Sequence, residues 1–242
     1  MSLSMRCAGM VMGSLMLAVP PLHAQDDSAL DTIMVTGSRI SYRDLLDTPA
    51  VSITRPGDFL LLPLVLVNDT RSEEGRRDEL HATIAKMLAG AGARFELVYG
   101  DTFTSRITRD NYKLPLDTDP KRPDVNSVSL FVRIAIDGAP ERAESMTLAL
   151  RGFAEKVERV GRTEIDIAKE TALSLTRPER FRHEIVAAIA EDTVKVRTAL
   201  GHRCKVLISG LSSRIEWERT SASELMLYIP YSMDISDCGE AG

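Results

Sequence analysis

The clearest strand signal in the chain is Val128-Ser129-Leu130-Phe131-Val132-Arg133-Ile134-Ala135-Ile136. Aliphatic residues occupy every second position of this stretch, so one face of the strand is apolar throughout. Such an alternation is typical of a half-buried strand, because successive side chains of a strand point to opposite faces. The fold is therefore expected to contain a sheet with at least one buried face.

Strand and helix patterns alternate on both sides of this stretch. Three amphipathic helices are expected around the pairs Leu80 and Ile84, Met146 and Leu150, and Ile185 and Ile189. Glycines follow them and indicate their ends at 90–92, 161 and 201. Further strands are expected at 59–67, 94–99, 102–108, 165–175, 204–209, 214–218 and 224–231.

This order mixes hairpins with crossover helices, which indicates an α+β fold. We expect mostly antiparallel sheets packed against three helices, and the recurring strand–helix unit is compatible with two related sub-domains. Pro63 is expected to place the strand 59–67 at a sheet edge or a bulge. The proline-rich segment 109–124 is expected to be a long exposed loop.

The first 24 residues have the three parts of a secretory signal peptide. Arg6 provides the positive charge, the stretch 7–19 is apolar, and Leu22-His23-Ala24 ends in a small residue suited to cleavage. The apolar stretch is shorter than the roughly 20 residues that span a bilayer, which disfavours a retained anchor. The sequence therefore predicts an exported, periplasmic protein without an integral membrane segment.

Composition narrows the classes of partner. The chain carries a net charge of −5 and no basic run, which argues against nucleic-acid binding because phosphate contacts dominate that affinity. Aromatic residues make up only 5% of the chain, whereas transmembrane barrels carry aromatic girdles.

Two cysteines, Cys204 and Cys238, follow the leader. Export exposes them to oxidising conditions, so they are candidates for a disulfide. Two unpaired thiols remain the alternative. A metal site is disfavoured, because His202 and Cys204 have no further ligands at a spacing that would complete one.

The sequence contains no G-x-S-x-G, P-loop or H-E-x-x-H motif, and it predicts neither catalytic residues nor a cofactor. Asp192 on the third helix is read as part of a structural salt bridge or as a solvated flank of the apolar stripe, and His183 as a surface residue. Asp117, Asp119 and Asp124 lack the spacing of a calcium loop. Trp217 is read as a core residue, with an interface aromatic as the alternative.

Three passages give the chain a resemblance to the SIMPL family of exported bacterial proteins, also called DUF541 or outer-membrane-protein-28-like. They are Leu62-Pro63-Leu64-Val65-Leu66-Val67 with the helix that follows, Glu184 to Thr193 with Leu200-Gly201, and Leu225-Met226-Leu227-Tyr228-Ile229-Pro230-Tyr231. The resemblance covers 51–236, leaving a C-terminal tail at 237–242. The resemblance implies no enzymatic chemistry, and it implies that the protein associates with itself into oligomers.

The preceding segment 25–50 is expected to be a flexible arm. Its stretch Asp31-Thr32-Ile33-Met34-Val35-Thr36-Gly37-Ser38-Arg39-Ile40 resembles the TonB box of TonB-dependent receptors. A TonB box adds an extended strand to a sheet of TonB. The resemblance makes Ile33, Val35, Thr36 and Gly37 candidate partner-binding residues.

A receptor also needs a plug and a barrel of about 22 strands, which a chain of 242 residues cannot supply. The functional expectation is therefore a non-enzymatic periplasmic protein that acts through protein contacts or self-assembly, with outer-membrane association left open. A TonB-interacting accessory protein is the alternative, and a periplasmic enzyme is the lesser one.

Overall fold

The computed structural model describes residues 32–35, 49–101, 103–201 and 204–238. Within them the chain is an α+β protein with three α-helices and antiparallel sheets, as the sequence predicts. The helices are α2 (Glu73–Ala91), α3 (Ala143–Lys156) and α4 (Arg182–Ala199). The strands are β1 (Thr32–Val35), β2 (Ile53–Pro56), β3 (Phe59–Asn68), β4 (Glu96–Gly100), β5 (Thr104–Arg106), β6 (Asp117–Asp119), β7 (Arg122–Ala135), β8 (Glu164–Ile167), β9 (Ala172–Thr176), β10 (Lys205–Ser209), β11 (Glu216–Arg219), β12 (Glu224–Tyr228) and β13 (Ser232–Ser236).

The largest sheet has eight strands in the order β1-β9-β3-β7-β4-β5, with β6 paired to β7 and β8 paired to β3. Strands β3 and β7 form its centre and pair over their whole common length, from Phe59 opposite Ala135 to Asn68 opposite Asn126. The alternating stretch that dominates the sequence is therefore the C-terminal part of the longest central strand.

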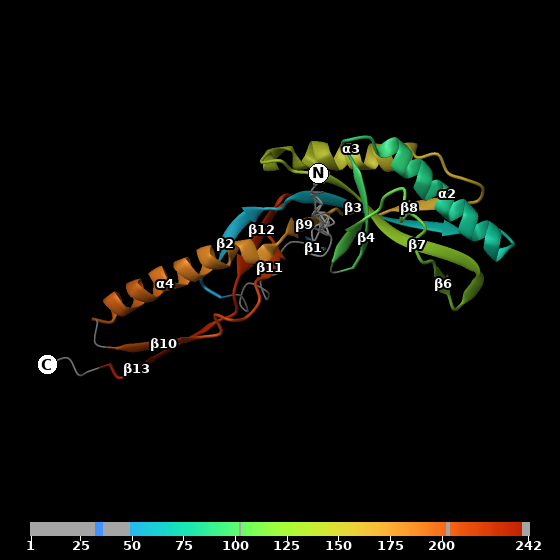
Figure 1. Ribbon diagram of the computed structural model, residues 1–242. Coiled ribbons are helices and arrows are strands. Elements are labelled where there is room, and N and C mark those ends of the chain that lie inside the picture. Colours follow the sequence, from blue (N-terminus) through green and yellow to red (C-terminus); the bar gives the residue numbers. More distant parts are fainter. Residues whose placement is uncertain (1–31, 36–48, 102, 202–203, 239–242) are drawn as a thin grey trace, which may run out of the picture.

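Helices α2 and α3 cover one face of this sheet (Figure 1). The even-numbered residues of β3, and those of β7 from Asn126 to Ile134, face these helices and are almost completely buried, with Leu62 opposite Val132 and Leu64 opposite Leu130. Burial of these aliphatic side chains against Leu80, Ile84 and Leu150 of the helices forms the main hydrophobic core. The opposite face carries a smaller cluster, in which the Arg133 guanidinium lies 3.9 Å from the Phe59 ring centre.

Pro63 lies in the central strand β3, so the prediction of an edge strand is wrong. Its carbonyl accepts a hydrogen bond from the Ala168 amide on the side of β8 and β9. Strand β9 pairs with β3 only up to Leu61, and β8 begins to pair at Leu64. A proline fits there because its missing N–H falls in the gap between two partner strands.

A smaller sheet, in the order β11-β12-β2, packs against the first half of α4. Leu225, Leu227 and Ile229 point into this second part of the core and meet Ile185 and Ile189 of the helix. Strands β10 and β13 pair only with each other, and they project together with the end of α4 away from the body of the molecule (Figure 1).

Several boundaries differ from the sequence predictions. The segment 109–124 is not an open loop throughout, because Leu114 is buried and β6 forms a hairpin with β7. Helix α3 ends at Lys156, so Gly161 does not terminate it. The strand expected at 224–231 ends at Tyr228, two residues before Pro230, which lacks a backbone donor. The strand expected at 165–175 is two strands, β8 and β9, and strands β1, β2, β6 and β13 are additional to those predicted.

Candidate interaction surfaces

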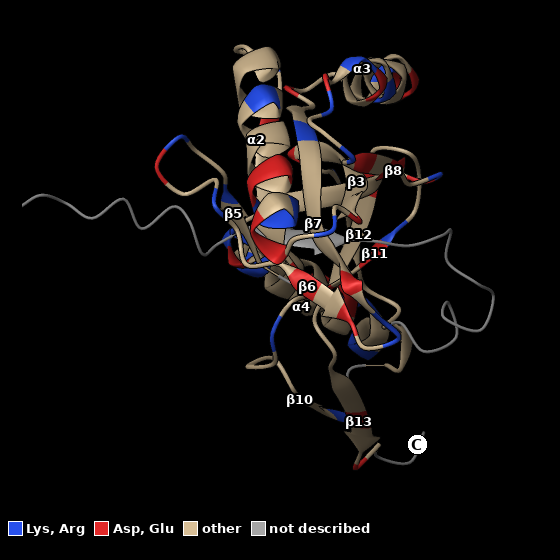
Figure 2. Ribbon diagram, turned by 90° about the vertical axis from the view of Figure 1, so that its right-hand side faces the viewer, with Lys and Arg blue, Asp and Glu red and all other residues tan. Residues whose placement is uncertain are grey.

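Exposed apolar side chains gather on the projecting arm formed by the second half of α4, the segment that follows it, β10 and β13. The exposed fraction is 64% for Val194 on the helix, 44% for Leu200 directly after it, and 59% for Leu207 and 44% for Ile235 on the strands. Figure 2 shows that few charged residues lie on these two strands. The third helix thus buries Ile185 and Ile189 as predicted, whereas its C-terminal half lies outside the core.

Cross-strand pairing fixes the two faces of the β10–β13 ribbon. Val206 lies opposite Ile235 and Ile208 opposite Met233, so one face is apolar. Leu207 lies opposite Asp234 on the other face, between a Lys205–Ser236 pair and a Ser209–Ser232 pair. Leu207 is therefore an exposed aliphatic side chain in an otherwise polar environment.

A disulfide between Cys204 and Cys238 closes the outer end of the ribbon, where β10 begins and β13 ends. Of the alternatives left open by the sequence, two free thiols and a bonded pair, the structure contains the bonded pair. The two cysteines are 34 residues apart, and the bond joins the segment after α4 to the segment after β13.

The TonB-box-like segment lies partly within the described residues. Thr32–Val35 form strand β1, which pairs antiparallel with the edge of β9, with Ile33 opposite Leu175 and Val35 opposite Leu173. Thr36 and Gly37 lie outside the described residues. The flexible N-terminal arm expected from the sequence therefore contains a strand. Its β-branched residues favour strand structure, and the strand pairs with a sheet edge of the same chain.

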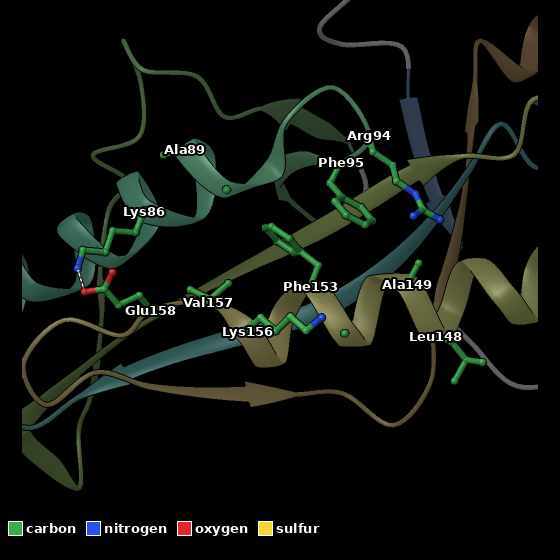
Figure 3. A pocket seen from close by; sticks show the side chains of 12 residues that line it. Lys86, Ala89, Arg94, Phe95, Leu148, Ala149, Phe153, Lys156, Val157 and Glu158 are labelled. Carbon is green, nitrogen blue, oxygen red and sulfur yellow. Dashed lines mark hydrogen bonds and ion pairs between the residues drawn. The ribbon is translucent and has the colours of Figure 1, made fainter.

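A groove of about 750 Å³ runs between α2 and α3 (Figure 3). Phe95 and Phe153 face each other in it with ring centres 4.9 Å apart, and an ion pair between Lys86 and Glu158 bridges its walls at one end. The groove is open beside Gly152, since a Cβ atom there would meet no other atom within 4 Å. The groove is a second apolar surface with a cationic rim, to which Arg94 and Lys156 also contribute.

The remaining polar residues singled out from the sequence do not converge on one site. His183 is exposed in the first turn of α4, and Asp192 lies nine residues further on, about 13 Å along the helix axis. Asp119 bonds the Lys121 amide and pairs with Arg122 in the β6–β7 turn. In the described part of the chain, no group of three or more His, Cys, Asp or Glu residues could hold a metal ion.

Two polar networks that the sequence does not predict, one partly buried around Glu79 and one buried around Arg76, hold α2 in place. Glu79 accepts hydrogen bonds from Asn68 Nδ2, Thr70 Oγ1 and the Arg162 amide at 2.7–2.8 Å, and these bonds hold the pKa of its carboxyl below the ordinary range. Arg76 donates to Asn126 Oδ1 at 2.6 Å and to the carbonyl oxygen of Thr70 at 2.9 Å. The only sign of these two networks in the sequence is that polar residues lie beside the buried apolar stripe of the helix.

Two tyrosines at the junction between the projecting arm and the small sheet have raised pKa values. Burial raises the pKa of Tyr228 to about 12, with a further contribution from its contact with Glu216. Burial also raises the pKa of Tyr231, and the charge of Asp192 on α4 adds to this effect. Both phenols are therefore neutral at physiological pH and contribute packing and polarity, without negative charge.

Comparison of the chain with protein-family models, with curated proteins and with solved structures finds no match. The resemblances to SIMPL proteins and to TonB boxes therefore remain predictions. Among the helices of the described segments, none combines the length and the apolar composition needed to cross a membrane.

Proposed function

We propose that this chain is an exported, non-enzymatic protein of SIMPL type that acts in the periplasm through protein contacts, chiefly with further copies of itself. The observation that carries the proposal is the projecting ribbon of β10 and β13. A two-stranded ribbon is marginally stable by itself in water, and both of its edges offer backbone groups to another strand. The predicted leader supports the location, and association with the outer membrane is compatible with it.

Charge favours the β10 edge over the β13 edge for symmetric pairing. Two β10 strands that meet antiparallel about a twofold axis at Leu207 bring Leu207 opposite its own copy and Lys205 opposite Ser209. The same arrangement of two β13 strands would bring Asp234 opposite Asp234, and like charges directly opposite each other are destabilising. We therefore propose a β10–β10 contact that buries Leu207.

Sedimentation velocity of the exported chain at micromolar concentration tests this proposal. The wild-type chain should self-associate, and Leu207→Lys should shift it to the monomer because two lysines would then lie opposite each other. Asp234→Lys is the matched control on the other edge and should assemble like the wild type. A wild-type monomer, or an unchanged assembly of the Leu207→Lys variant, would contradict the proposal.

A second proposed function is docking to a TonB-like partner through residues 31–40. It is favoured by the antiparallel pairing of Thr32–Val35 with a sheet edge, since strand addition is the recognition mode such docking requires. The same backbone groups cannot pair with β9 and with a partner at once. Docking therefore requires β1 to leave β9.

Titration of a peptide covering 31–40 against a TonB C-terminal domain, followed by NMR, tests this second function. The peptide should shift amide signals along one sheet edge. The full chain should bind more weakly than the peptide, because it first loses the β1–β9 pairing. The absence of shifts with the peptide would rule the docking out.

A further inference from the structure

A cavity of about 790 Å³ lies between the segment preceding α4 and the start of β11. Its walls include Arg177 and Arg180 on one side, Arg214 and Trp217 on the other, and Phe103 from the turn before β5. The volume falls within the range of about 300–1,000 Å³ that is typical of small-molecule sites. The cavity lies apart from the β10 edge on which the proposed assembly depends.

Cations predominate in this cavity, although the whole chain is acidic. Among the residues that line the cavity, Glu179 is the acidic one. The Glu179 Oε2 atom accepts a hydrogen bond from Arg182 Nε at 2.7 Å. This bond holds the pKa of the Glu179 carboxyl below its ordinary range, so the charge is present but already paired. Arg180 is likewise engaged, with Asp58 Oδ1 at 2.7 Å.

Arg177 and Arg214 differ from these neighbours. Both are exposed, and within the described residues neither guanidinium forms a hydrogen bond or an ion pair. A guanidinium carries five N–H donors in a planar fork that matches a carboxylate or a phosphate. The cavity therefore presents two cationic forks with no hydrogen-bonded partner among the described residues, and the charge of Arg214 also acts on Glu179.

The backbone of Arg177 is also unusual. Its φ of 47° and ψ of 67° place it in the left-handed region, which costs a non-glycine residue free energy. The conformation directs the chain from β9 into the 3₁₀ turn Pro178–Phe181, which forms one wall of the cavity. Such strain in a wall residue with a free cationic side chain is typical of a functional position.

Aromatic and aliphatic side chains form the rest of the cavity. Trp217 is half-buried, Phe103 is 50% exposed, and Ile215 is almost completely buried behind them. Aromatic side chains that remain partly exposed around a cavity retain apolar area that a ligand can cover. The cavity thus combines an apolar interior with cations that can orient one anionic group.

We propose that this cavity binds a small organic anion in which one carboxylate is attached to an apolar body. The carboxylate lies between Arg177 and Arg214, and the apolar body packs on Trp217 and Phe103. The proposal is independent of self-assembly, because it involves neither the β10 edge nor the ribbon.

The fluorescence of Trp217 provides a direct test, since it is the single tryptophan of the chain. Octanoate titrated into the full chain should change the Trp217 emission saturably, and calorimetry should give the same dissociation constant. 1-Octanol, which has the same chain length without the charge, should bind at least tenfold more weakly. Equal affinity for the two probes, or no saturable response in both measurements, would overturn the proposal.

Three variants localise the binding. Arg214→Ala and Arg177→Gly should each weaken octanoate binding by about tenfold or more, because each removes one charge-assisted contact. Glycine is chosen at 177 because it accepts the left-handed backbone. Arg197→Ala removes an exposed cation from α4 and should bind like the wild type. Circular dichroism confirms folding, and wild-type affinity in both cavity variants would refute the assignment.

Discussion

Gly161 lies against the carboxyl group of Glu79, so closely that a Cβ atom on Gly161 would stand 2.1 Å from the Glu79 carboxyl carbon. Gly161 also has a φ of +55°, in the region that favours glycine. The contact joins α2 to the loop between α3 and β8. From its place in the sequence Gly161 is expected to end a helix, whereas in the structure it packs against Glu79.

Gly161→Ala should lower the free energy of unfolding by about 3 kcal/mol, because it adds backbone strain and displaces the hydrogen-bonded Glu79. Gly138→Ala is the matched control, since Gly138 has a φ of +68° but no atom within 4 Å of its would-be Cβ. The control should lose only about 1 kcal/mol. Urea denaturation measures both, and equal losses would contradict the packing role.

The Glu79 network predicts a pH dependence of stability. The pKa of Glu79 is lowered in the folded chain, chiefly by its hydrogen bond from Asn68. Its carboxylate therefore stabilises the fold fully above the unfolded pKa of glutamate, about 4.3, and this contribution is lost as the pH falls through the lower folded value.

Glu79→Gln should thus be less stable than the wild type at neutral pH, and the difference should shrink on acidification below about pH 4.3. Denaturation curves recorded across this pH range measure the difference. Glu74→Gln, an exposed change on the same helix, should follow the wild-type profile. A wild-type-to-Gln difference that stays constant with pH would show that charge on Glu79 is not involved.

Neighbouring arginines on α2 should differ sharply in their contribution. Arg76 is 6% exposed and donates to the side chain of Asn126 and to carbonyl oxygens, whereas Arg77 forms an exposed ion pair with Glu73. Arg76→Ala should cost about 2–3 kcal/mol because it leaves buried acceptors unpaired. Arg77→Ala should cost about 0.5 kcal/mol or less. Comparable losses in thermal or urea denaturation would argue against the buried role.

The disulfide should stabilise the chain measurably. A bond that closes a loop of 34 residues is expected to contribute about 3–4 kcal/mol by restricting the unfolded chain. Denaturation with and without reductant should reveal this loss. The double variant Cys204→Ser, Cys238→Ser should match the reduced wild type and be insensitive to reductant. Equal stability of the oxidised and reduced forms would exclude the contribution.

Removal of β1 should expose alternate amides of β9. The Ser174 carbonyl accepts a hydrogen bond from the Asp58 amide, and the Thr176 amide donates one to the Asp58 carboxylate, both on the β3 side of β9. Because backbone groups of successive residues in a strand point to opposite sides, the N–H groups of Leu173 and Leu175 point towards β1. Deletion of 32–35 should therefore speed amide exchange at Leu173 and Leu175 and leave Ser174 protected. Residue-resolved hydrogen exchange measures this, and unchanged protection at both leucines would mean that β1 does not cover the edge.

Local patterns alone were enough for the α+β class, the three helices and the central strands. Side chains that are buried must recur with the period of the strand or helix that carries them. The sequence therefore shows the buried faces directly, in the alternation from Val128 to Ile136 and in the stripe containing Leu80 and Ile84. Pro63 was misread because a central strand tolerates proline only where its partner changes from β9 to β8, which depends on residues about a hundred positions away.

The sites depended on the tertiary structure. Cys204 and Cys238 were visible in the sequence, but their bond requires β10 and β13 to pair. The contact of Gly161 with Glu79, and the cavity that brings Arg177, Arg214 and Trp217 together, join segments with no common periodic pattern. The sequence by itself determined which faces are buried, because burial follows local hydrophobic periodicity. Only the tertiary structure decided which polar groups meet, because such contacts are set by how distant elements pack.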